Sequence, residues 1–358
     1  MAKALKTVLV SDVREGGAQR LAVEGADRAR ALRDDCLAIL PRAMTPLIPL
    51  LDRLAQRWLT HSRSPYLPEI GAIAGALGFP GVWLLNGSYQ WGCTAVAREE
   101  DGKPWLARTL DWPFHGLGYH VEVARMRGPA GEFYSVTWPG YVGALTAMAP
   151  GRFGASINQA PLWRRTSHPW LRLYDIAANA TNTWRLRHMP PDQLLRLIFE
   201  SCGSFADARN MLETTPIARP VIFVLAGTNS GERCVIERTE TGFVTRFDST
   251  SAANDWNDTK ENWEARIGGM NVLLLSREDA ARRSRARQNS LSGFGGTFAR
   301  NSFSWIVEPV LNPCTRMGVE MCPASGQMRV VGYDVVPGFA LPQQVTEICE
   351  IGPDRLAA

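Results

Sequence analysis

The sequence predicts a layered α+β domain. After residue 92, apolar residues alternate with a period of two in runs that Gly and Pro separate, which is typical of strands. These runs follow one another like antiparallel hairpins, and the helical patterns are grouped between them instead of alternating with single strands. Because no repeat or low-complexity linker divides the 358 residues, we expect a single body.

The region before residue 92 is expected to be helical. Apolar residues recur at helical spacing over 18–60, and Pro41, Pro46 and Pro49 divide this run into pieces. Another helix is expected over 68–78, and no strand is expected before residue 92. Since these helices are amphipathic, they need the rest of the chain to cover their apolar faces.

The rest of the chain contains two groups of strands with helices between and after them. Strands are expected over 93–98, 105–109, 120–126, 133–138, 153–158, 221–226, 233–238, 243–248 and 327–335. Helices are expected over 170–184, 191–202, 205–213 and 277–288.

Composition excludes several classes of protein. An apolar fraction of 45% excludes general disorder, and the 39 basic residues form no long stripe, so we expect no nucleic-acid partner. No window approaches eighteen apolar residues, which excludes a membrane-spanning helix. The first apolar run, Val8–Val10, is too short for a signal peptide, so we expect a cytoplasmic protein.

Seven cysteines form no CxxC pair and no Cys/His cluster with zinc spacing, so no metal site is expected. Cys93 is the candidate nucleophile. A turn at 101–102 returns the chain so that Arg108 and Asp111, fifteen and eighteen residues later, lie beside it. The cation favours a thiolate, and the carboxylate orients an ammonium group.

Two kinds of group could act as the base that takes the proton of this thiol. His115 and His120 lie near Cys93 in the sequence, although neither belongs to a local signature of thiol proteases. Alternatively, cleavage after Gly92 frees an α-amine with a reference pKa of about 7.7–8.0, which takes a thiol proton at neutral pH. A glycine at position 92 leaves the thiol close access to its carbonyl.

Residues 92–114, GCTAVAREEDGKPWLARTLDWPF, resemble the first hairpin of the N-terminal nucleophile (Ntn) hydrolases of the choloylglycine hydrolase group. The branch of acid ceramidase and N-acylethanolamine-hydrolysing acid amidase is the most similar. The resemblance continues through 140–161, 214–238, AANDW at 252–256 and EPVLN at 308–312, and covers about 65 to 335. It implies a four-layer αββα sandwich with a helical N-terminal segment.

The resemblance implies that the chain cuts itself between Gly92 and Cys93. Residues 1–92 become an α chain, and 93–358 become a β chain that stays bound to it. Cys93 is then the nucleophile and the new N-terminus. Arg108 holds the thiol side of the site, and Asp111 binds the α-amine.

The resemblance also implies an oxyanion hole. Asn254 in AANDW helps to form it, and Asn158 in SINQ shares that role. An arginine of SREDAARRSRARQ completes the set, and Arg283 is preferred over Arg282.

The implied activity is hydrolysis of the C–N bond of a linear N-acyl amide through a Cys93 acyl-thioester, with no cofactor. A small-molecule substrate is the expected partner, and we expect Trp112, Phe114 and Trp138 to line an acyl pocket. Two alternatives remain open: an acyltransferase that passes the same acyl group to an amine, and an uncut lipid- or amide-binding protein of this fold.

Overall fold

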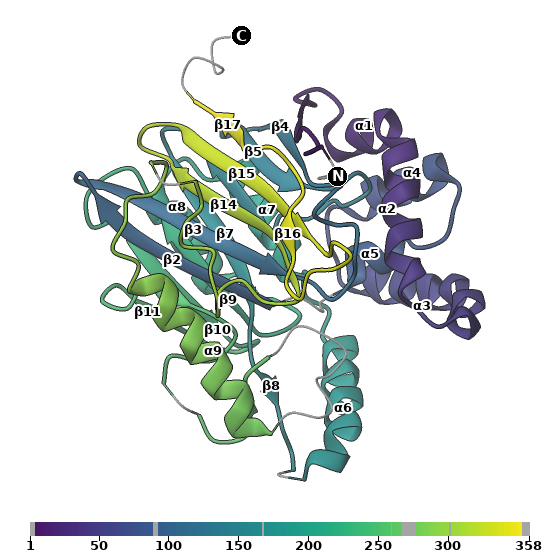
Figure 1. The fold of residues 1–358 in the computed structure, drawn as a ribbon. Helices are drawn as coiled ribbons and strands as arrows, with labels where there is room; N and C mark the ends of the chain where they lie inside the picture. Colours follow the sequence, from purple (N-terminus) through teal and green to yellow (C-terminus); the bar gives the residue numbers. More distant parts are fainter. Residues whose placement is uncertain are drawn as a thin grey trace.

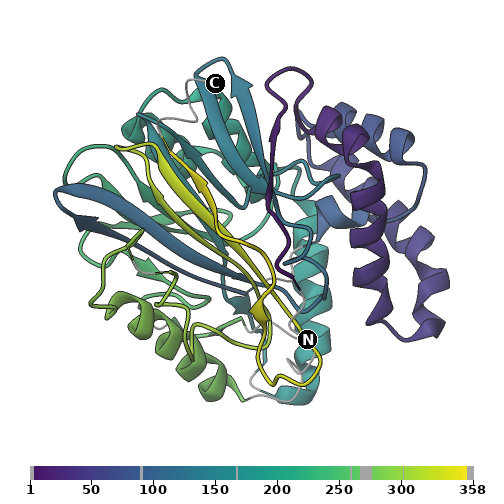
Figure 2. The same cartoon turned by 45° about the horizontal axis from the view of Figure 1, so that its top comes forward.

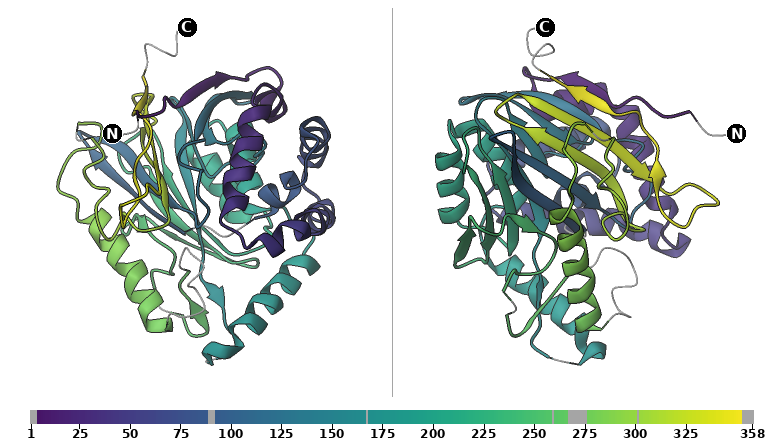
Figure 3. Two further views of the ribbon diagram at one scale, coloured as in Figure 1. Left: turned by 45° about the vertical axis from the view of Figure 1, so that its right-hand side comes forward. Right: turned by 60° about the vertical axis from the view of Figure 1, so that its left-hand side comes forward.

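The computed structural model describes residues 4–88, 92–166, 168–258, 260–266, 276–300 and 302–352. Two large β-sheets pack face to face, and helices lie outside them (Figures 1 and 3). The predicted αββα sandwich is confirmed in this part of the chain.

The first sheet has eight strands among the described residues, in the order β1-β4-β5-β6-β7-β9-β10-β11. Apart from the parallel pair of β1 with β4, the neighbouring strands run antiparallel. Their bounds are β1 Leu9–Asp12, β4 Glu122–Gly128, β5 Gly131–Thr137, β6 Thr146–Ala149, β7 Phe153–Gln159, β9 Val221–Ala226, β10 Arg233–Arg238 and β11 Phe243–Arg246.

The second sheet has the order β12-β2-β3-β14-β15-β16 within the described ranges, and β17 also pairs with β15. The expected turn joins β2 to β3: Asp101 has φ 51° and Gly102 has φ 73°, as a tight two-residue hairpin requires. The bounds are β2 Gly92–Glu100, β3 Lys103–Asp111, β12 Ser251–Ala252, β14 Thr315–Cys322, β15 Gln327–Asp334, β16 Gln343–Gln344 and β17 Cys349–Ile351.

Helices cover the outer faces of both sheets. In the eight-stranded sheet, α7 (Pro191–Ser201) packs on β4 to β7, and α8 (Phe205–Thr214) packs on β9 and β10. The inner faces meet where β2 and β3 lie against β7 and β9. On the outer face of the second sheet, α9 (Arg277–Ser292) lies against β2 and β12, as the green helix of Figure 1 shows.

The N-terminal helices form a separate group at one side of the sandwich (Figure 2). The helix α6 and a small sheet of two strands lie at the lower edge in Figure 1. The bounds are α1 Gly17–Glu24, α2 Ala26–Ala38, η1 Arg42–Leu47, α3 Ile48–His61, α4 Leu67–Leu77, α5 Val82–Gly87, β8 Leu162–Trp163, η2 Pro169–Leu171, α6 Arg172–Arg185 and β13 Trp263–Glu264.

The expectation of no strand before residue 92 is wrong. The strand β1 is short and mostly exposed, so main-chain pairing with β4 defines it and no apolar alternation marks it. The strand β14 also lacks alternation, because every one of its residues is buried. Its Gly318 packs against Ile306, whose Cδ1 would have to move to make room for a Cβ at this position.

A buried charge network joins the N-terminal segment to the rest of the chain. The Arg196 guanidinium on α7 donates to Glu69 on α4 at 2.6 Å and to Glu200 at 2.8 Å. Glu200 also accepts a hydrogen bond of 2.6 Å from the Tyr66 hydroxyl. Removing this cation leaves two partly buried carboxylates close to each other.

We therefore expect Arg196→Met to lower the free energy of unfolding by about 3 kcal/mol, as for other broken buried ion pairs. Arg20→Met is the matched control, because the Arg20–Glu24 pair is about half exposed on both sides and such pairs contribute less than about 1 kcal/mol. Urea unfolding measures both variants. Equal losses of unfolding free energy in the two variants would contradict a larger contribution from the buried network.

Candidate active site

The β2–β3 hairpin places Cys93 and Arg108 side by side. Cys93 pairs with Leu110, and Ala95 pairs with Arg108, so Cys93 and Arg108 are diagonal neighbours on one face of the sheet. The Nη2 of Arg108 lies 2.9 Å from the Cys93 Sγ. The predicted juxtaposition of this cation and this thiol is present.

Arg108 lies between the two sheets with no exposed surface. Its Nη1 donates to the Thr146 hydroxyl at 2.8 Å, and its Nη2 donates to the Ile157 carbonyl at 3.1 Å. Burial lowers the pKa of Arg108, while the Cys93 and Asp111 groups oppose that change. Since both of these oxygen partners are neutral, a negative charge on the Cys93 sulfur would compensate the buried cation directly.

In the uncut chain the Cys93 thiol is fully buried. Burial raises its pKa to about 11, although the Arg108 and Arg287 cations and a hydrogen bond from the Gln159 backbone act in the other direction. The thiol therefore stays protonated at neutral pH in this state. It donates to the Ile157 carbonyl at 3.5 Å.

Asp111 lies on the other side of the Gly92–Cys93 peptide. Asp111 pairs with Gly92, and Cys93 pairs with Leu110. The Asp111 and Cys93 side chains therefore point to opposite faces of the sheet. Its carboxylate accepts hydrogen bonds from Arg287 and Asn312, both at 2.8 Å, and from Thr315 at 3.0 Å. This carboxylate is thus held in one orientation by three side chains.

Gly92 fits closely between these groups. A Cβ at this position would lie 3.3 Å from the Asp111 Cβ and 3.4 Å from the Asn254 Oδ1. The peptide before Cys93 therefore packs directly against Asp111 and Asn254, with little room for a side chain.

Asn254 contacts Cys93 through its side chain. Its Oδ1 accepts from the Cys93 backbone N–H at 2.8 Å and from the Arg287 Nη2 at 2.9 Å. Its Nδ2 donates to the Gln159 carbonyl at 2.8 Å, and its own N–H donates to the Ser284 hydroxyl at 3.0 Å. The structure therefore brings Asn254 together with Cys93, Arg108 and Asp111.

Asn158 has a different position. Its Nδ2 donates to the carbonyls of Ala252 and Ala253 at 3.1 Å, so its amide hydrogens are directed at the segment that leads into Asn254. Its Oδ1 is buried and has no hydrogen-bond partner among the described residues, so the role of Asn158 in an oxyanion hole stays a prediction.

The preference for Arg283 is wrong: Arg283 is exposed, and Arg287 is the arginine of the cluster. Arg287 donates to Asp111, to Asn254 and, at 3.2 Å, to the Cys93 carbonyl. The buried face of α9 consists of Ala280, Ser284, Arg287 and Leu291, at helical spacing. This apolar and small-residue stripe is the sequence signal that distinguishes Arg287 from its neighbours.

Four further residues of the cluster were missed by sequence reasoning. Thr146, Asn312 and Ser284 lie within the segments GALTAMAP, EPVLN and SREDAARRSRARQ that carry the resemblance, while no sequence signal indicates Thr315.

The structure gives the Cys–His alternative no support. His120 pairs with Asp35 through a contact of 2.8 Å, and His115 is exposed with its carbonyl facing the Cys36 thiol. Both histidines contact residues of α2, and the contacts of the Cys93 thiol given above involve neither imidazole.

A cavity of about 340 Å³ adjoins the site, since Ile157 and Gln159 belong to its wall. Trp112, Phe114 and Trp138 do not line it, so their predicted place in a substrate pocket is wrong for this cavity. Trp112 and Trp138 instead pack edge to face in the core, with ring centres 6.4 Å apart.

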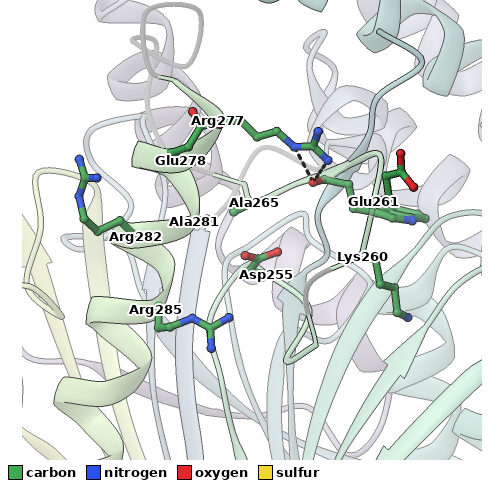
Figure 4. Close-up of a pocket in the computed structure, with 10 residues that line it drawn as sticks. Asp255, Lys260, Glu261, Ala265, Arg277, Glu278, Ala281, Arg282 and Arg285 are labelled. Atoms are coloured by element: carbon green, nitrogen blue, oxygen red, sulfur yellow. Dashed lines mark hydrogen bonds between the residues drawn. The ribbon is translucent and has the colours of Figure 1, made fainter. Parts of the chain in front are cut away.

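A larger cavity of about 590 Å³ lies between α9, Asp255 and 260–265 (Figure 4), and Cys93 does not line it. Its charged side chains are of both signs, four cations and three carboxylates. They are Asp255, Lys260, Glu261, Arg277, Glu278, Arg282 and Arg285.

Within the described residues, no helix has the length and apolar character needed to cross a membrane. The same residues contain no group of three His, Cys, Asp or Glu side chains placed to hold a metal ion.

Comparison with known proteins finds relatives among amide hydrolases, although no family model matches the chain. N-acylethanolamine-hydrolyzing acid amidase of Oryctolagus cuniculus is 31% identical over 164 residues, which are 44% of this chain and 43% of that protein. Acid ceramidase of Bos taurus is 27% identical over 216 residues, 54% and 52% of the two proteins. The chain thus spans about half the length of these relatives.

A longer match is found with acid ceramidase of Mus musculus, 26% identical over 302 residues, or 78% of this chain and 73% of that protein. A solved structure of a Caenorhabditis elegans N-acylethanolamine-hydrolyzing acid amidase ortholog has a TM-score of 0.47 and 17% identity, covering 65% of this chain and 93% of that one. The sequence matches confirm the resemblance to this group of hydrolases.

The position of Arg287 leads to a stability test. We expect Arg287→Met to lower the free energy of unfolding by about 3 kcal/mol, because it leaves the Asp111 carboxylate buried without its cation. Arg283→Met, on the exposed face of the same helix, should change it by less than about 0.5 kcal/mol. Thermal unfolding of both variants measures these changes. A larger loss of stability from Arg283→Met than from Arg287→Met would contradict the assignment of Arg287 to the cluster.

Proposed function

We propose that this chain, which is similar in sequence to acid ceramidase and N-acylethanolamine-hydrolysing acid amidase, is a self-processing cysteine amidase. It would hydrolyse the C–N bond of an N-acyl amide. The observation that carries the proposal is the contact of 2.9 Å between the buried Arg108 guanidinium and the Cys93 sulfur. A buried cation at a thiol stabilises the thiolate that attacks a carbonyl carbon.

Self-cleavage would begin with attack of the Cys93 sulfur on the Gly92 carbonyl carbon. The acyl group moves from the Cys93 nitrogen to its sulfur, and the thiol proton passes to the nitrogen. Water then hydrolyses the thioester, which leaves a Gly92 carboxylate and a free Cys93 thiol. The close packing of Gly92 against Asp111 and Asn254 supports this step, because it holds the peptide in one place.

In turnover, the freed α-amine of Cys93 would take the thiol proton and return it to the leaving amine. Asn254 already accepts a hydrogen bond from this nitrogen in the uncut chain, and Asp111 lies on the same side. The Asn254 Nδ2 is the candidate donor to the tetrahedral oxyanion, once it exchanges the Gln159 carbonyl for the substrate. Water finally releases the acyl group from sulfur.

The fragments 1–92 and 93–358 would remain associated after cleavage. The Glu69–Arg196 pair and the pairing of β1 with β4 both connect these two parts of the chain. The expected partner of the mature protein is a small-molecule N-acyl amide.

Intact mass of the purified protein beside Cys93→Ala tests the proposal directly. Scaling 39.5 kDa by residue count predicts wild-type fragments of roughly 10 and 29 kDa, with Cys93 at the new N-terminus, and an uncut variant. Cys234→Ala is the matched control, since Cys234 is a buried free cysteine on β10 and its loss should leave cleavage intact. Wild-type protein that stays whole over a wide pH range would overturn self-processing.

The pH dependence of self-cleavage follows from the raised pKa of the Cys93 thiol. Because this pKa is about 11 in the uncut chain, the thiolate fraction is small at neutral pH and increases up to that value. We expect the cleavage rate to rise about tenfold per pH unit from about pH 7 to 10. Time courses of freshly refolded precursor measure this, and a rate that falls with pH would show that thiolate formation is not limiting.

A further inference from the structure

The first sheet holds the guanidinium of Arg108 at two points. Its Nη1 donates to the Thr146 hydroxyl on β6 at 2.8 Å, and its Nη2 donates to the Ile157 carbonyl on β7 at 3.1 Å. The second hydrogen of Nη2 is then available to the Cys93 sulfur, 2.9 Å away. Because the guanidinium is a rigid planar fork, these two anchor points determine the direction of the contact with the sulfur.

The two anchors belong to one piece of paired sheet. Thr146 and Ser156 lie directly opposite each other in the β6–β7 pair, and the Ile157 N–H donates to the Leu145 carbonyl at 3.0 Å. All four residues are fully buried. Main-chain pairing therefore fixes the Thr146 hydroxyl relative to the Ile157 carbonyl, and no loop is involved in placing the cation.

Thr146 supplies the one side-chain oxygen that contacts this cation among the described residues. The Nε of Arg108 is buried and has no hydrogen-bond partner within the same ranges. The hydroxyl of Ser156 is also buried there without a partner, so it does not share the role of Thr146. Loss of the Thr146 oxygen would leave both Nε and Nη1 of a buried cation unpaired, which is unfavourable in the observed orientation.

Among the charged groups that act on the Cys93 thiol, Arg108 has the largest influence. Burial raises the pKa of this thiol, Arg108 opposes burial most strongly, Asp111 raises the pKa, and Arg287 lowers it to a smaller extent. Asp111 and Arg287 form an ion pair of 2.8 Å on the other face of the hairpin. A guanidinium that turned away from the sulfur would therefore remove the main stabilisation of the thiolate.

We propose that Thr146 is a positioning residue, whose hydroxyl holds the Arg108 guanidinium against the Cys93 sulfur during self-cleavage and during attack on an amide substrate. The inference rests on the proposed amidase function. Thr146 acts on the sulfur through Arg108, and it is not among the residues that line the cavity of about 340 Å³. It should therefore affect the rate of attack by the sulfur and not the binding of the substrate.

Thr146→Val tests the proposal, because valine has nearly the shape of threonine and lacks the hydroxyl. We expect self-cleavage of the freshly refolded precursor at neutral pH to slow by at least about tenfold, as for the loss of one hydrogen bond to a charged group. Thr146→Ser keeps the hydroxyl and should cleave within about threefold of the wild-type rate. Intact mass at successive times gives these rates.

Thr109→Val is the matched control. Thr109 follows Arg108 on β3, is fully buried, and its hydroxyl has no hydrogen-bond partner in the described part of the chain. Its side chain points to the opposite face of the sheet from Arg108. The same substitution here should leave the cleavage rate within about threefold of wild type, because the guanidinium loses no bond.

Thermal unfolding of each variant separates slow cleavage from failed folding. If Thr146→Val shows no cooperative transition, Thr146→Ala replaces it, because alanine removes the same hydroxyl and introduces no new contact.

Turnover by the mature proteins gives a readout that a loss of stability alone would not change. With N-lauroylethanolamine as the probe, Thr146→Val should lower kcat by at least about tenfold and leave KM within about twofold, because the residue lies outside the cavity. Alkylation of Cys93 by iodoacetamide, followed on its peptide by mass spectrometry, should require a pH about one unit higher in this variant than in wild type.

The outcomes separate the two proposals. Wild-type protein that neither cleaves itself nor hydrolyses the probe overturns the amidase function, and this inference with it. Wild-type protein that cleaves itself, beside a folded Thr146→Val variant with an unchanged cleavage rate, overturns only the role of Thr146. Equal losses of rate in Thr146→Val and Thr109→Val, or in Thr146→Val and Thr146→Ser, would also overturn that role, since the Thr146 hydroxyl would then not be the cause. Self-cleavage decides the matter if this one amide is not a substrate.

Discussion

The buried guanidinium of Arg108 is the constraint around which the two sheets are arranged. A cation without exposed surface needs polar partners, and here β2, β6 and β7 supply its two Nη atoms with a thiol, a hydroxyl and a carbonyl, while its Nε has no hydrogen-bond partner among the described residues. These contacts require the hairpin register, the close approach of the two inner faces and the buried hydroxyl of Thr146. The same contacts place the cation at the sulfur of Cys93.

A second cation acts on the opposite side of the same peptide. Arg287 from α9 contacts the Cys93 carbonyl, the Asp111 carboxylate and the Asn254 amide oxygen, so one side chain connects the helix to both hairpin strands and to the 252–256 segment. Cys93 is thus buried between two positive groups, with Arg108 at its sulfur and Arg287 at its carbonyl oxygen. Burial nevertheless keeps the Cys93 thiol protonated. Two cations are nearby, so it is the loss of water around the sulfur that opposes its ionisation.

Sequence patterns within one hairpin predicted the site residues that lie on that hairpin. The Asp101–Gly102 turn and the alternation around it determine which residues pair, so Cys93, Arg108 and Asp111 followed from the sequence. Asn254 lies 161 residues from Cys93, and only the family resemblance indicated it. Arg287 was not distinguished because the five arginines of α9 look alike in the sequence until the buried stripe is known.

The remaining errors have a similar physical origin. Trp112 and Trp138 were assigned to a pocket, but apolar aromatic rings suit a core as well as a cavity, and composition does not separate the two. The arginines that do line the cavity, Arg219 and Arg266, come from distant segments without any shared pattern. Such a set becomes visible only when the tertiary packing brings its members together.

The strand β1 gives self-cleavage a thermodynamic consequence. It belongs to the segment before residue 92 and extends the eight-stranded sheet by parallel pairing with β4. In a chain cut after Gly92, this sheet would be assembled from two polypeptides, and refolding would change from a unimolecular reaction into an association of two species. The denaturation midpoint would then depend on protein concentration, and dilution of the unfolded fragments would prevent recovery. After self-cleavage, folding would no longer be readily reversible. The lifetime of the native state would then depend on its rate of unfolding.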